Sequence, residues 1–505
     1  MVAPNHQKRF SHSKVLKTLK ELRLFLMKLQ FKTSDAVTAT RKVTRSRNTE
    51  NWETEGQHRN TLSHLLMAML FLQCFGNHEF VYKPSGLAPF LNAINFPIVA
   101  ANLDFSNEPA LSSYGITKSW IFEIEGKRIG VIGYLTPLTT VKSYVGNVKF
   151  EEEIPAITLE SEKLRNASVK TIIALGHSGY KMDKKIAAQV PLVDLVIGGH
   201  TNTFLWNGAQ IDLEVPQGPY PTLVTQPNGK VVLVVQTYSY TKYMGRLSVI
   251  INDKGEIIYF YGTPQVLNSI VPQEEDALNL LKKYRVELDI AATTVVGYSN
   301  SVLVGGKKQC RYNECTFANL ITDAFVLYYK LHYGVNSIGV ISSTTPYNSI
   351  VPGQNGTITM FDMLTALPYG GNVYSTILTG ADIWKSLEIG VKGNGDTAGR
   401  YFLHTSGIQY GYNKSESLGS RIKFVKVRCY ECKNLTYADI NVTTQYRIVT
   451  TEFLINGLDE HSLIKNNGMN TTVANKTEME IILWYIKKNS PLNVKLEDRV
   501  TILSQ

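Results

Sequence analysis

The chain has 505 residues, of which 44% are hydrophobic and 19% are charged, a composition typical of globular proteins with two or three domains. The formal net charge is +10, but residues 1–50 contain twelve Lys or Arg against three Asp or Glu, so the rest of the chain is nearly neutral. Because that larger part has no basic patch interleaved with aromatic residues, the sequence argues against a nucleic-acid-binding protein.

The first residues lack the pattern of a secretory signal, which needs a short basic region, an apolar stretch and a small-residue cleavage site. Residues 8–32 have instead the spacing of a basic amphipathic helix, and the apolar run at 65–75 is too short to span a bilayer. The sequence ends in DRVTILSQ, which is not a lipid-anchor signal. We expect residues 1–60 to be an atypical basic segment, disordered or derived from a mis-assembled gene model, and we expect no transmembrane segment.

A mixed α/β domain is predicted for residues 61–271, because apolar runs that end in turn residues alternate with a helical pattern. The predicted strands are NFPIVAANL at 95–103, a hairpin at 120–135, VKTIIALGHSG at 169–179, VDLVIGGHTNT at 193–203, and two closing antiparallel segments at 230–240 and 246–262. Residues 180–190 are predicted to form a helix between two of these strands.

A capped helix is predicted at 272–289, where a proline and early acidic residues are followed by late basic ones. We expect residues 272–292 to be a linker helix between two domains. The remainder, 293–505, is predicted to be a second α/β domain, with a helix at 317–329 and a strand at 446–455.

Four of the five cysteines form two close pairs, Cys310/Cys315 and Cys429/Cys432. Such pairs are typical of zinc sites, of redox motifs, or of short disulfide loops in an oxidising compartment. Glycosylation sequons favour a secreted, extracellular glycoprotein, although no signal peptide is visible. They occur at Asn166, Asn355, Asn413, Asn434, Asn441, Asn470 and Asn475.

Three predicted strands end in glycine followed by a polar side chain, in the segments FGNHEF, ALGHSG and VIGGHTNT. Open α/β sheets bind ligands at the carboxyl ends of their strands, so these ends are expected to meet around one cleft. Imidazole and amide groups are suitable ligands for a divalent cation. The expected site residues are Asn77, His78, His177, His200 and Asn202.

These segments resemble the 5'-nucleotidase/apyrase family of dinuclear metallophosphoesterases, which includes the secreted salivary apyrases of blood-feeding arthropods. The resemblance extends from about residue 76 to the end of the chain. It implies a metallophosphoesterase domain of mixed sheets with flanking helices, incomplete here, followed by an α/β substrate-binding domain. By resemblance His78 is the catalytic histidine, Asn77, His177 and His200 are ligands of one divalent metal ion, and Asn202 is a ligand of the other.

In the second domain, CRYNEC resembles the disulfide loop of the family, in which Arg311 would bind phosphate. LPYGG and FLINGLDE imply that Tyr369 and Phe453 stack on the nucleobase and that Asp459 binds the ribose, and stacking tolerates any base. The CxxC motif at 429–432 also matches a disulfide of the family, which weakens the zinc and redox interpretations.

The sequence departs from the family in several places. No Asp-x-His or Gly-Asp motif precedes Gly76, and Asp35 is the only earlier aspartate, so the bridging carboxylate of a two-metal site is missing and one metal ion is expected instead of two. Val81 replaces an aspartate that orients the catalytic histidine. Ser342 and Tyr347 occupy the positions of a substrate-binding amide and a phosphate-binding arginine.

The resemblance implies hydrolysis of nucleoside 5'-phosphates (AMP, ADP or ATP) by metal-activated water. The alternative is a catalytically inactive secreted paralogue that binds nucleotides or a protein partner. The departures fit either a mis-assembled gene model, which would explain residues 1–75, or a decayed paralogue, which would explain Val81 and Tyr347.

Overall fold

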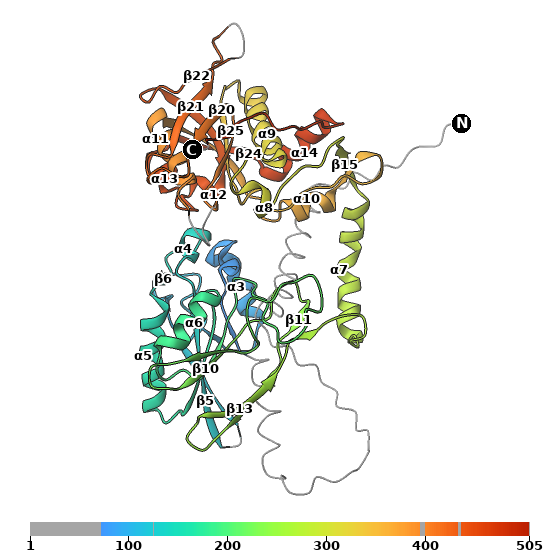
Figure 1. Ribbon diagram of the computed structural model, residues 1–505. Helices are drawn as coiled ribbons and strands as arrows, with labels where there is room; N and C mark the ends of the chain where they lie inside the picture. Colours follow the sequence, from blue (N-terminus) through green and yellow to red (C-terminus); the bar gives the residue numbers. More distant parts are fainter. Residues whose placement is uncertain (1–71, 125, 394–398, 433–435, 504–505) are drawn as a thin grey trace, which may run out of the picture. The chain divides into compact units, whose positions relative to one another are not determined.

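The computed structural model describes residues 72–124, 126–393, 399–432 and 436–503 (Figure 1). The segment predicted to be atypical, residues 1–60, lies outside the described residues. The chain forms two compact units that divide within helix α7 (Glu275–Thr293), the first ending at Ala277 and the second beginning at Leu278. In the part of the chain that is described, no helix is both long and apolar enough to cross a membrane.

The first unit is built around a mixed six-stranded sheet. Its strands, in spatial order, are β4 (Ser119–Ile124), β5 (Lys127–Leu135), β7 (Thr171–His177), β8 (Leu195–Ile197), β10 (Val231–Val235) and β9 (Thr222–Thr225). The central four strands are parallel, and each edge strand is antiparallel to its neighbour. Every residue of β7 is buried, as expected for a central strand that is covered on both faces.

Alternate residues of these strands enter two different cores, because successive side chains of a strand point to opposite faces. Helices α5 (Glu153–Asn166) and α6 (Tyr180–Gln189) pack on one face, in a cluster that includes Ile132 and Ile186 (Figure 1). The opposite face carries Val131 and Leu175, which pack with residues of the β12 (Leu247–Ile251) and β13 (Ile257–Gly262) hairpin. The predicted helix at 180–190 and the predicted hairpin at 120–135 are thus confirmed.

Shorter elements complete the first unit. They are β1 (Gln73–Cys74), η2 (Asn77–Phe80), α3 (Lys83–Ala93), β2 (Ile98–Val99), β3 (Leu103–Asp104), α4 (Thr139–Lys142), β6 (Lys149–Phe150), β11 (Tyr243–Met244) and β14 (Gln265–Val266). Strand β1 pairs with β2 rather than with the main sheet. The predicted antiparallel closure by residues 230–240 and 246–262 is confirmed for the β12–β13 hairpin and for the pairing of β10 with β9. It is wrong for the other side of β10, which is parallel to β8.

The second unit contains two larger sheets. The five-stranded sheet has the order β19 (Leu403–Ser406), β16 (Ile338–Ser342), β23 (Gln445–Thr451), β18 (Asn372–Thr379) and β24 (Met469–Thr477). The four-stranded sheet has the order β22 (Tyr437–Asp439), β21 (Ile422–Arg428), β20 (Ile408–Tyr412) and β25 (Val500–Ile502). Strands β15 (Val295–Tyr298) and β17 (Thr357–Thr359) form a separate antiparallel pair.

Helices pack against the five-stranded sheet in two cores. One core contains apolar residues of α9 (Thr316–Tyr333) and α14 (Glu478–Asn489), and the other contains residues of α11 (Gly380–Gly390) and α13 (Ser462–Asn467). The predicted helix at 317–329 is confirmed. The short elements are α8 (Lys307–Cys310), η3 (Gln354–Gly356), α10 (Met360–Ala366) and α12 (Glu452–Ile455).

The predicted strand at 446–455 is too long. Strand β23 ends at Thr451, whose hydroxyl accepts the backbone N–H of Leu454 and so caps helix α12. Phe453 therefore lies on a short helix and not on a strand, because a threonine cap within an apolar run begins a helix where β-branched composition alone predicts continued strand.

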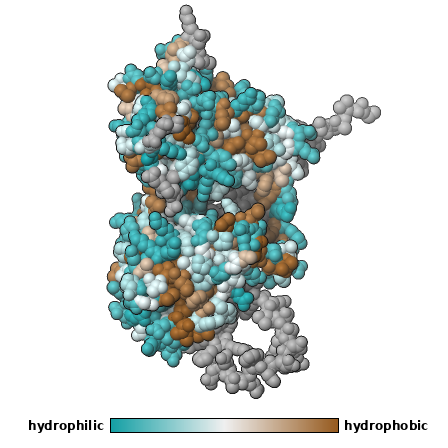
Figure 2. Space-filling model, viewed as in Figure 1, coloured by the Kyte–Doolittle hydropathy of each residue, from teal (hydrophilic) through white to brown (hydrophobic). Residues whose placement is uncertain are grey.

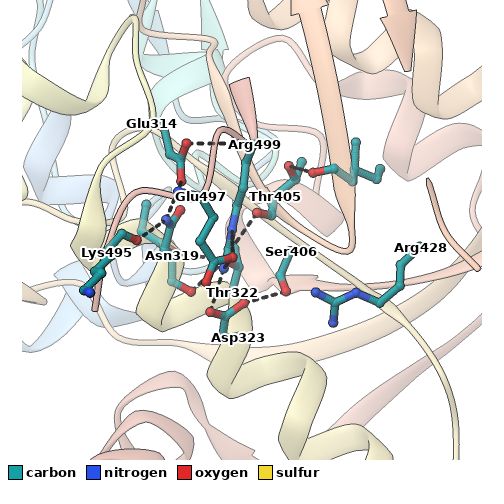
Figure 3. A network of polar contacts seen from close by, with 12 residues as sticks. Glu314, Asn319, Thr322, Asp323, Thr405, Ser406, Arg428, Lys495, Glu497 and Arg499 are labelled. Atoms are coloured by element: carbon teal, nitrogen blue, oxygen red, sulfur yellow. Dashed lines mark hydrogen bonds and ion pairs between the residues drawn. The ribbon is translucent and has the colours of Figure 1, made fainter. Parts of the chain in front are cut away.

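A buried arginine connects the C-terminal strand to the rest of the second unit (Figure 3). Arg499 is 3% exposed, and its guanidinium binds Asp323 at 2.7 Å, Glu497 at 2.8 Å and the backbone oxygen of Thr405 at 3.0 Å. The Arg499 backbone N–H donates to Glu314 at 2.8 Å. Carboxylates surround this cation, as a buried charge requires.

The surface of both units is mixed in polarity. Figure 2 shows hydrophobic residues as separate patches within a largely hydrophilic surface. Scattered exposed apolar side chains of this kind are normal for globular proteins and do not indicate a function.

Candidate metal and nucleotide-binding sites

Three of the predicted site residues meet in the first unit. The Asn77 side-chain oxygen Oδ1 lies 3.2 Å from His177 Nε2 and 3.1 Å from His200 Nδ1. The two imidazole rings are 4.9 Å apart between centroids. Asn77 and His177 are buried, at 7% and 8% exposure, and His200 is half-buried. Two imidazole nitrogens from separate segments of the chain therefore lie within contact distance of the same amide oxygen.

Local backbone geometry brings His177 and Asn77 together. His177 is the last residue of β7, and Asn77 is the first residue of η2, directly after Gly76. A Cβ atom at Gly76 would lie 3.2 Å from the His177 ring and 2.8 Å from Glu79 Oε2. Glycine allows this close approach, because a Cβ atom here would have to displace the imidazole by a few tenths of an ångström.

His200 reaches the site from the loop after β8, in a left-handed backbone conformation with φ of 76°. Gln236, which follows β10, holds this loop on both sides of the histidine: its Nε2 donates to the Gly199 carbonyl at 3.0 Å and its Oε1 accepts the Thr203 N–H at 3.1 Å. Bonds on both sides of His200 fix a conformation that is otherwise uncommon for a residue with a side chain.

The geometry fits a divalent cation. Two ligands at right angles on a cation, each about 2.1 Å from it, are about 3.0 Å apart. The observed separations of 3.1 and 3.2 Å around Asn77 Oδ1 are close to that value. One amide oxygen with two imidazole nitrogens is a mixed O/N donor set that suits zinc, manganese or iron.

Lys142, which ends α4, also contacts this group: its ammonium nitrogen lies 2.8 Å from His200 Nε2. An ammonium group can only donate, so Nε2 must carry the lone pair and Nδ1 the proton. A cation held by Asn77 Oδ1 and His200 Nδ1 needs the lone pair on Nδ1 instead. The Lys142 contact and metal binding through Nδ1 therefore require different tautomers of His200.

Lys142→Met is expected to tighten binding of Mn²⁺ or Zn²⁺ by about tenfold, since the metal-free protein loses a charge-assisted hydrogen bond that must break before His200 can ligate. Titration calorimetry of the metal-free protein measures this affinity directly. Lys149→Met, which removes an exposed cation from β6 of the same unit, should leave the affinity unchanged. Equal or weaker binding in Lys142→Met would contradict the competition.

The other two residues predicted in this region have exposed side chains. His78 follows Asn77 in η2, and Asn202 lies two residues beyond His200 with φ of 55°. The exposed His78 imidazole is accessible to a substrate, whereas Asn77 and His177 are buried.

In the second unit Asp459 is fully buried and held by the chain itself. Its Oδ1 accepts from Arg400 Nε at 2.7 Å, and its Oδ2 accepts from Ser342 Oγ at 3.0 Å and from Thr344 Oγ1 at 3.4 Å. Burial raises the pKa of Asp459, and Arg400 and both hydroxyls oppose that rise. Asp459 thus orients Arg400.

Arg400 belongs to a cluster of three cations. Burial and the nearby Arg400 charge lower the pKa of Arg311, and burial followed by Arg311 and Arg400 lowers that of Lys307. Arg311 also lines a cavity of about 230 Å³ together with Lys414 and Arg421. Among the described residues, Asp459 is the carboxylate that binds Arg400 and acts on Arg311, and no carboxylate acts on the pKa of Lys307. The cluster therefore keeps an excess of positive charge that suits a phosphate group.

Two aromatic residues predicted to bind a nucleobase lie on neighbouring segments of the second unit. Tyr369 is 43% exposed, and the ring of Tyr347 contacts it edge-on at 5.5 Å between centroids. Phe453 is on α12, whose Glu452 accepts the side-chain and backbone N–H groups of Asn372 at 3.2 and 3.4 Å. This pairing joins the Tyr369 loop to the helix that carries Phe453.

Glu478→Gln is expected to flatten the pH dependence of stability. Burial, with Glu452 adding to it, raises the pKa of Glu478 from 4.5 to about 8, although the Gly371 N–H opposes the rise. The folded protein therefore keeps a proton that the unfolded chain releases. The free energy of unfolding falls as pH rises from 4.5 to about 8, by up to about 1.4 kcal/mol per pH unit, and levels off above the pKa of the folded state.

Urea unfolding midpoints across the same pH window measure this slope for the wild type and for Glu478→Gln. The control is Glu431→Gln, which changes an exposed glutamate in the same unit and should keep the wild-type slope. If the stability of Glu478→Gln depends on pH as steeply as that of the wild type, a group other than Glu478 causes this dependence.

Both predicted cysteine pairs form disulfides, Cys310–Cys315 and Cys429–Cys432. The buried His404 lies near the first pair and contacts the Cys310 carbonyl oxygen through Nε2 at 2.8 Å. Because the two sulfurs are bonded to each other, this group is not a zinc site. The zinc and redox interpretations of the cysteine spacing are not supported.

Two known domain families match the sequence: "Calcineurin-like phosphoesterase" over residues 51–204 and "5'-nucleotidase, C-terminal domain" over residues 290–466. Protein 5NUC of Lutzomyia longipalpis is 38% identical over 446 residues, which cover 85% of this chain and 77% of that protein. The 5'-nucleotidase of Bos taurus is 34% identical over 448 residues, covering 87% of this chain and 78% of the relative. This chain belongs to the 5'-nucleotidase family.

A solved structure supports the same fold. The crystal structure of a 5'-nucleotidase precursor from Thermus thermophilus aligns with a TM-score of 0.74 and 31% identity, covering 89% of this chain and 87% of that one. The predicted architecture, a metallophosphoesterase domain followed by a 5'-nucleotidase C-terminal domain, is confirmed. Members of the 5'-nucleotidase family are phosphoesterase hydrolases that act on nucleotides, and their first domain implies divalent metal ions.

Sequence reasoning missed two charged residues of this 5'-nucleotidase family member. Lys142 lies beyond β5, whose last residue, Leu135, is in register with His177 on the parallel strand β7. Because the ends of parallel strands converge, the loop after β5, residues 136–143, is also expected to lie near His177. Arg400 had no comparable signal, since its role depends on the position of Asp459.

Proposed function

We propose that this chain hydrolyses the 5'-phosphate of a nucleoside phosphate at the group formed by Asn77, His177 and His200. The observation that carries the proposal is the convergence of one amide oxygen and two imidazole nitrogens at strand ends. We further propose that residues 61–271 form the metallophosphoesterase domain, 272–292 a linker helix and 293–505 the nucleotide-binding domain.

Asn77, His177 and His200 would hold one divalent cation, which when bound lowers the pKa of a coordinated water and polarises a phosphoryl oxygen. His78, exposed beside these ligands, would stabilise negative charge on the phosphoryl group as a positioned donor. The amide of Asn202, two residues beyond His200, is available for a second cation. The sequence lacks the Asp-x-His and Gly-Asp motifs that would complete that second site upstream of Gly76.

Arg311, Arg400 and Lys307 would bind the substrate phosphate. Tyr347 stands where the family pattern has a phosphate-binding arginine, and a tyrosine cannot make charge-assisted bonds of that kind. Arg400, held by Asp459 beside Arg311, supplies a guanidinium in its place. Tyr369 and Phe453 would stack on the base, and Tyr347 would support Tyr369 from its edge.

A secreted location is proposed from two observations. Two disulfides form in the second unit, which is typical of proteins that fold in an oxidising compartment. Relatives with matching sequences include a snake venom 5'-nucleotidase of Gloydius brevicauda, 33% identical over 87% of this chain.

Release of inorganic phosphate from AMP, ADP and ATP tests the function, with the metal-free protein supplied in turn with Mn²⁺, Zn²⁺, Mg²⁺ and Ca²⁺. We expect metal-dependent release that a chelator abolishes. Nucleotide binding by calorimetry without any release under these metals would instead favour the inactive binding protein and overturn the proposal.

Arg400→Met is expected to raise KM for AMP by about 10- to 100-fold with a smaller effect on kcat, because the substrate phosphate loses a charge-assisted contact. Arg400→Lys keeps the charge and should restore part of the affinity. Lys385→Met removes an exposed cation from α11 of the same unit and should leave KM unchanged. An unchanged KM in Arg400→Met would assign Arg400 to folding alone.

A further inference from the structure

Strand β24 is the edge of the five-stranded sheet. It pairs with β18 on one side, and none of the described strands pairs with its other side. Among its nine residues only Ala474 is buried. An edge strand presents N–H and C=O groups that another chain can pair with, and proteins normally protect such edges with charges, prolines, bulges or covering segments.

The composition of β24 gives little of this protection. Its sequence, MNTTVANKT, has one charged residue, Lys476, which is engaged with Glu480 at 2.9 Å. Met469 and Val473 are 37% and 54% exposed, so apolar side chains accompany an edge that no described strand covers, although the Asn475 backbone N–H donates to the Tyr333 hydroxyl at 3.3 Å. A long and nearly uncharged edge of this kind is prone to edge-to-edge association.

Two glycosylation sequons lie within this one strand, Asn470-Thr-Thr472 and Asn475-Lys-Thr477, and both asparagines are exposed. The pairing with β18 is irregular at both places. One break in register lies between Met469 and Thr472, and the other lies between Val473 and Thr477. Asn470 has a left-handed φ of 50°. Each sequon asparagine therefore lies where the strand bulges away from regular pairing.

The Asn475 side chain is already oriented. Its Oδ1 accepts hydrogen bonds from the hydroxyls of Tyr328 at 2.8 Å and Tyr333 at 3.2 Å, both on α9. With the amide oxygen fixed against the tyrosines, the amide nitrogen Nδ2 is turned to the other side. Nδ2 is the atom to which an N-linked glycan is attached.

We propose that Asn470 and Asn475 both carry N-linked glycans, and that these glycans cover the free edge of β24 and prevent it from pairing with a second copy of the chain. The proposal rests on the secreted location proposed above. In the modification, Nδ2 loses a proton and bonds to the anomeric carbon of a lipid-diphosphate-linked oligosaccharide, while the carbon–oxygen bond to the diphosphate breaks and the lipid diphosphate leaves. The asparagines are five residues apart, about 17 Å along the strand, so two glycans cover most of its length.

Occupancy is measured first, by glycopeptide mass spectrometry of the full chain secreted from a eukaryotic host. We expect glycan on Asn470 and Asn475. Asn355, an exposed sequon residue in η3, serves as an internal reference for export. Glycan on Asn355 but not on the β24 asparagines would overturn the inference and leave the secreted location intact. Absence of glycan at all three would also overturn the inference, because the secreted chain would then carry no glycan on β24.

Protection of the edge is tested by measuring the oligomeric state, with size-exclusion chromatography and light scattering over a range of protein concentrations. The double variant Asn470→Gln/Asn475→Gln is expected to form a species of higher mass than the wild type, and Asn355→Gln is expected to behave as the wild type. Because Asn475→Gln disturbs the tyrosine contacts, a high-mannose glycoform trimmed by endoglycosidase provides a second measurement with every side chain intact. If the trimmed protein keeps the oligomeric state of the untrimmed protein at every concentration, the glycans do not protect this edge.

Discussion

Replacing His177 by alanine is expected to reduce phosphate release from AMP to background and to weaken metal binding by more than about 100-fold. Loss of a residue that only supports a metal ligand typically costs 10- to 100-fold, and His177 is proposed as a ligand itself. Its Nε2 lies 3.2 Å from Asn77 Oδ1, so its removal leaves two of the three converging atoms. Calorimetric titration with Mn²⁺ or Zn²⁺ and the phosphate assay measure the two effects separately.

The matched control is His332→Ala. His332 is an exposed histidine of α9 in the second unit, where its ring stacks on Tyr328. The same change of residue type there should alter neither metal affinity nor kcat for AMP. Normal metal binding by the His177→Ala protein would mean that the three converging residues are not the metal site.

Replacing Arg499 by methionine is expected to destabilise the protein by about 3 kcal/mol, because it removes a buried cation whose partners then lack a donor. The guanidinium is 3% exposed and reaches Asp323, Glu497 and the Thr405 carbonyl (Figure 3). The partial exposure of Asp323 and Glu497 moderates the loss, since water solvates them once the arginine is gone.

Urea denaturation at neutral pH measures this free energy. Arg285→Met breaks a fully surface ion pair with Asp289 on α7, and it should cost less than about 0.5 kcal/mol. Equal effects of the two changes would show that the Arg499 network contributes no more than an exposed pair.

The convergence of Asn77, His177 and His200 was predictable from the sequence because its signal is local. Glycine and histidine at the end of an apolar strand mark a position in the chain and also a position in the sheet, since parallel strands end at one edge. That rule accounts for His177, which ends β7 of the main sheet, and His200, which follows β8, whereas Asn77 reaches them from β1 of a separate two-stranded sheet. The helical spacing of apolar residues in the sequence also predicted α6 and α9 correctly.

Other features depend on tertiary contacts that no local pattern encodes. The pairing of β10 with β8, and not with the hairpin β12–β13, follows from which sheet buries its apolar residues. Arg400 matters because a buried Asp459 lies 59 positions away along the chain. The predicted loss of the bridging carboxylate concerns residues 1–75, and residues 1–71 lie outside the described part of the chain. That prediction therefore rests on the sequence alone.

Arg311 sits inside a six-residue covalent ring that the Cys310–Cys315 bond closes, and the His404 contact to the Cys310 carbonyl anchors this ring from the other side. Protein produced in a reducing cytosol would lack that closure while retaining the proposed cation ligands of the first unit, where neither disulfide lies. Such protein would bind metal normally but bind nucleotides poorly. Low activity of that material would then result from reduced cysteines and not from loss of function in the sequence.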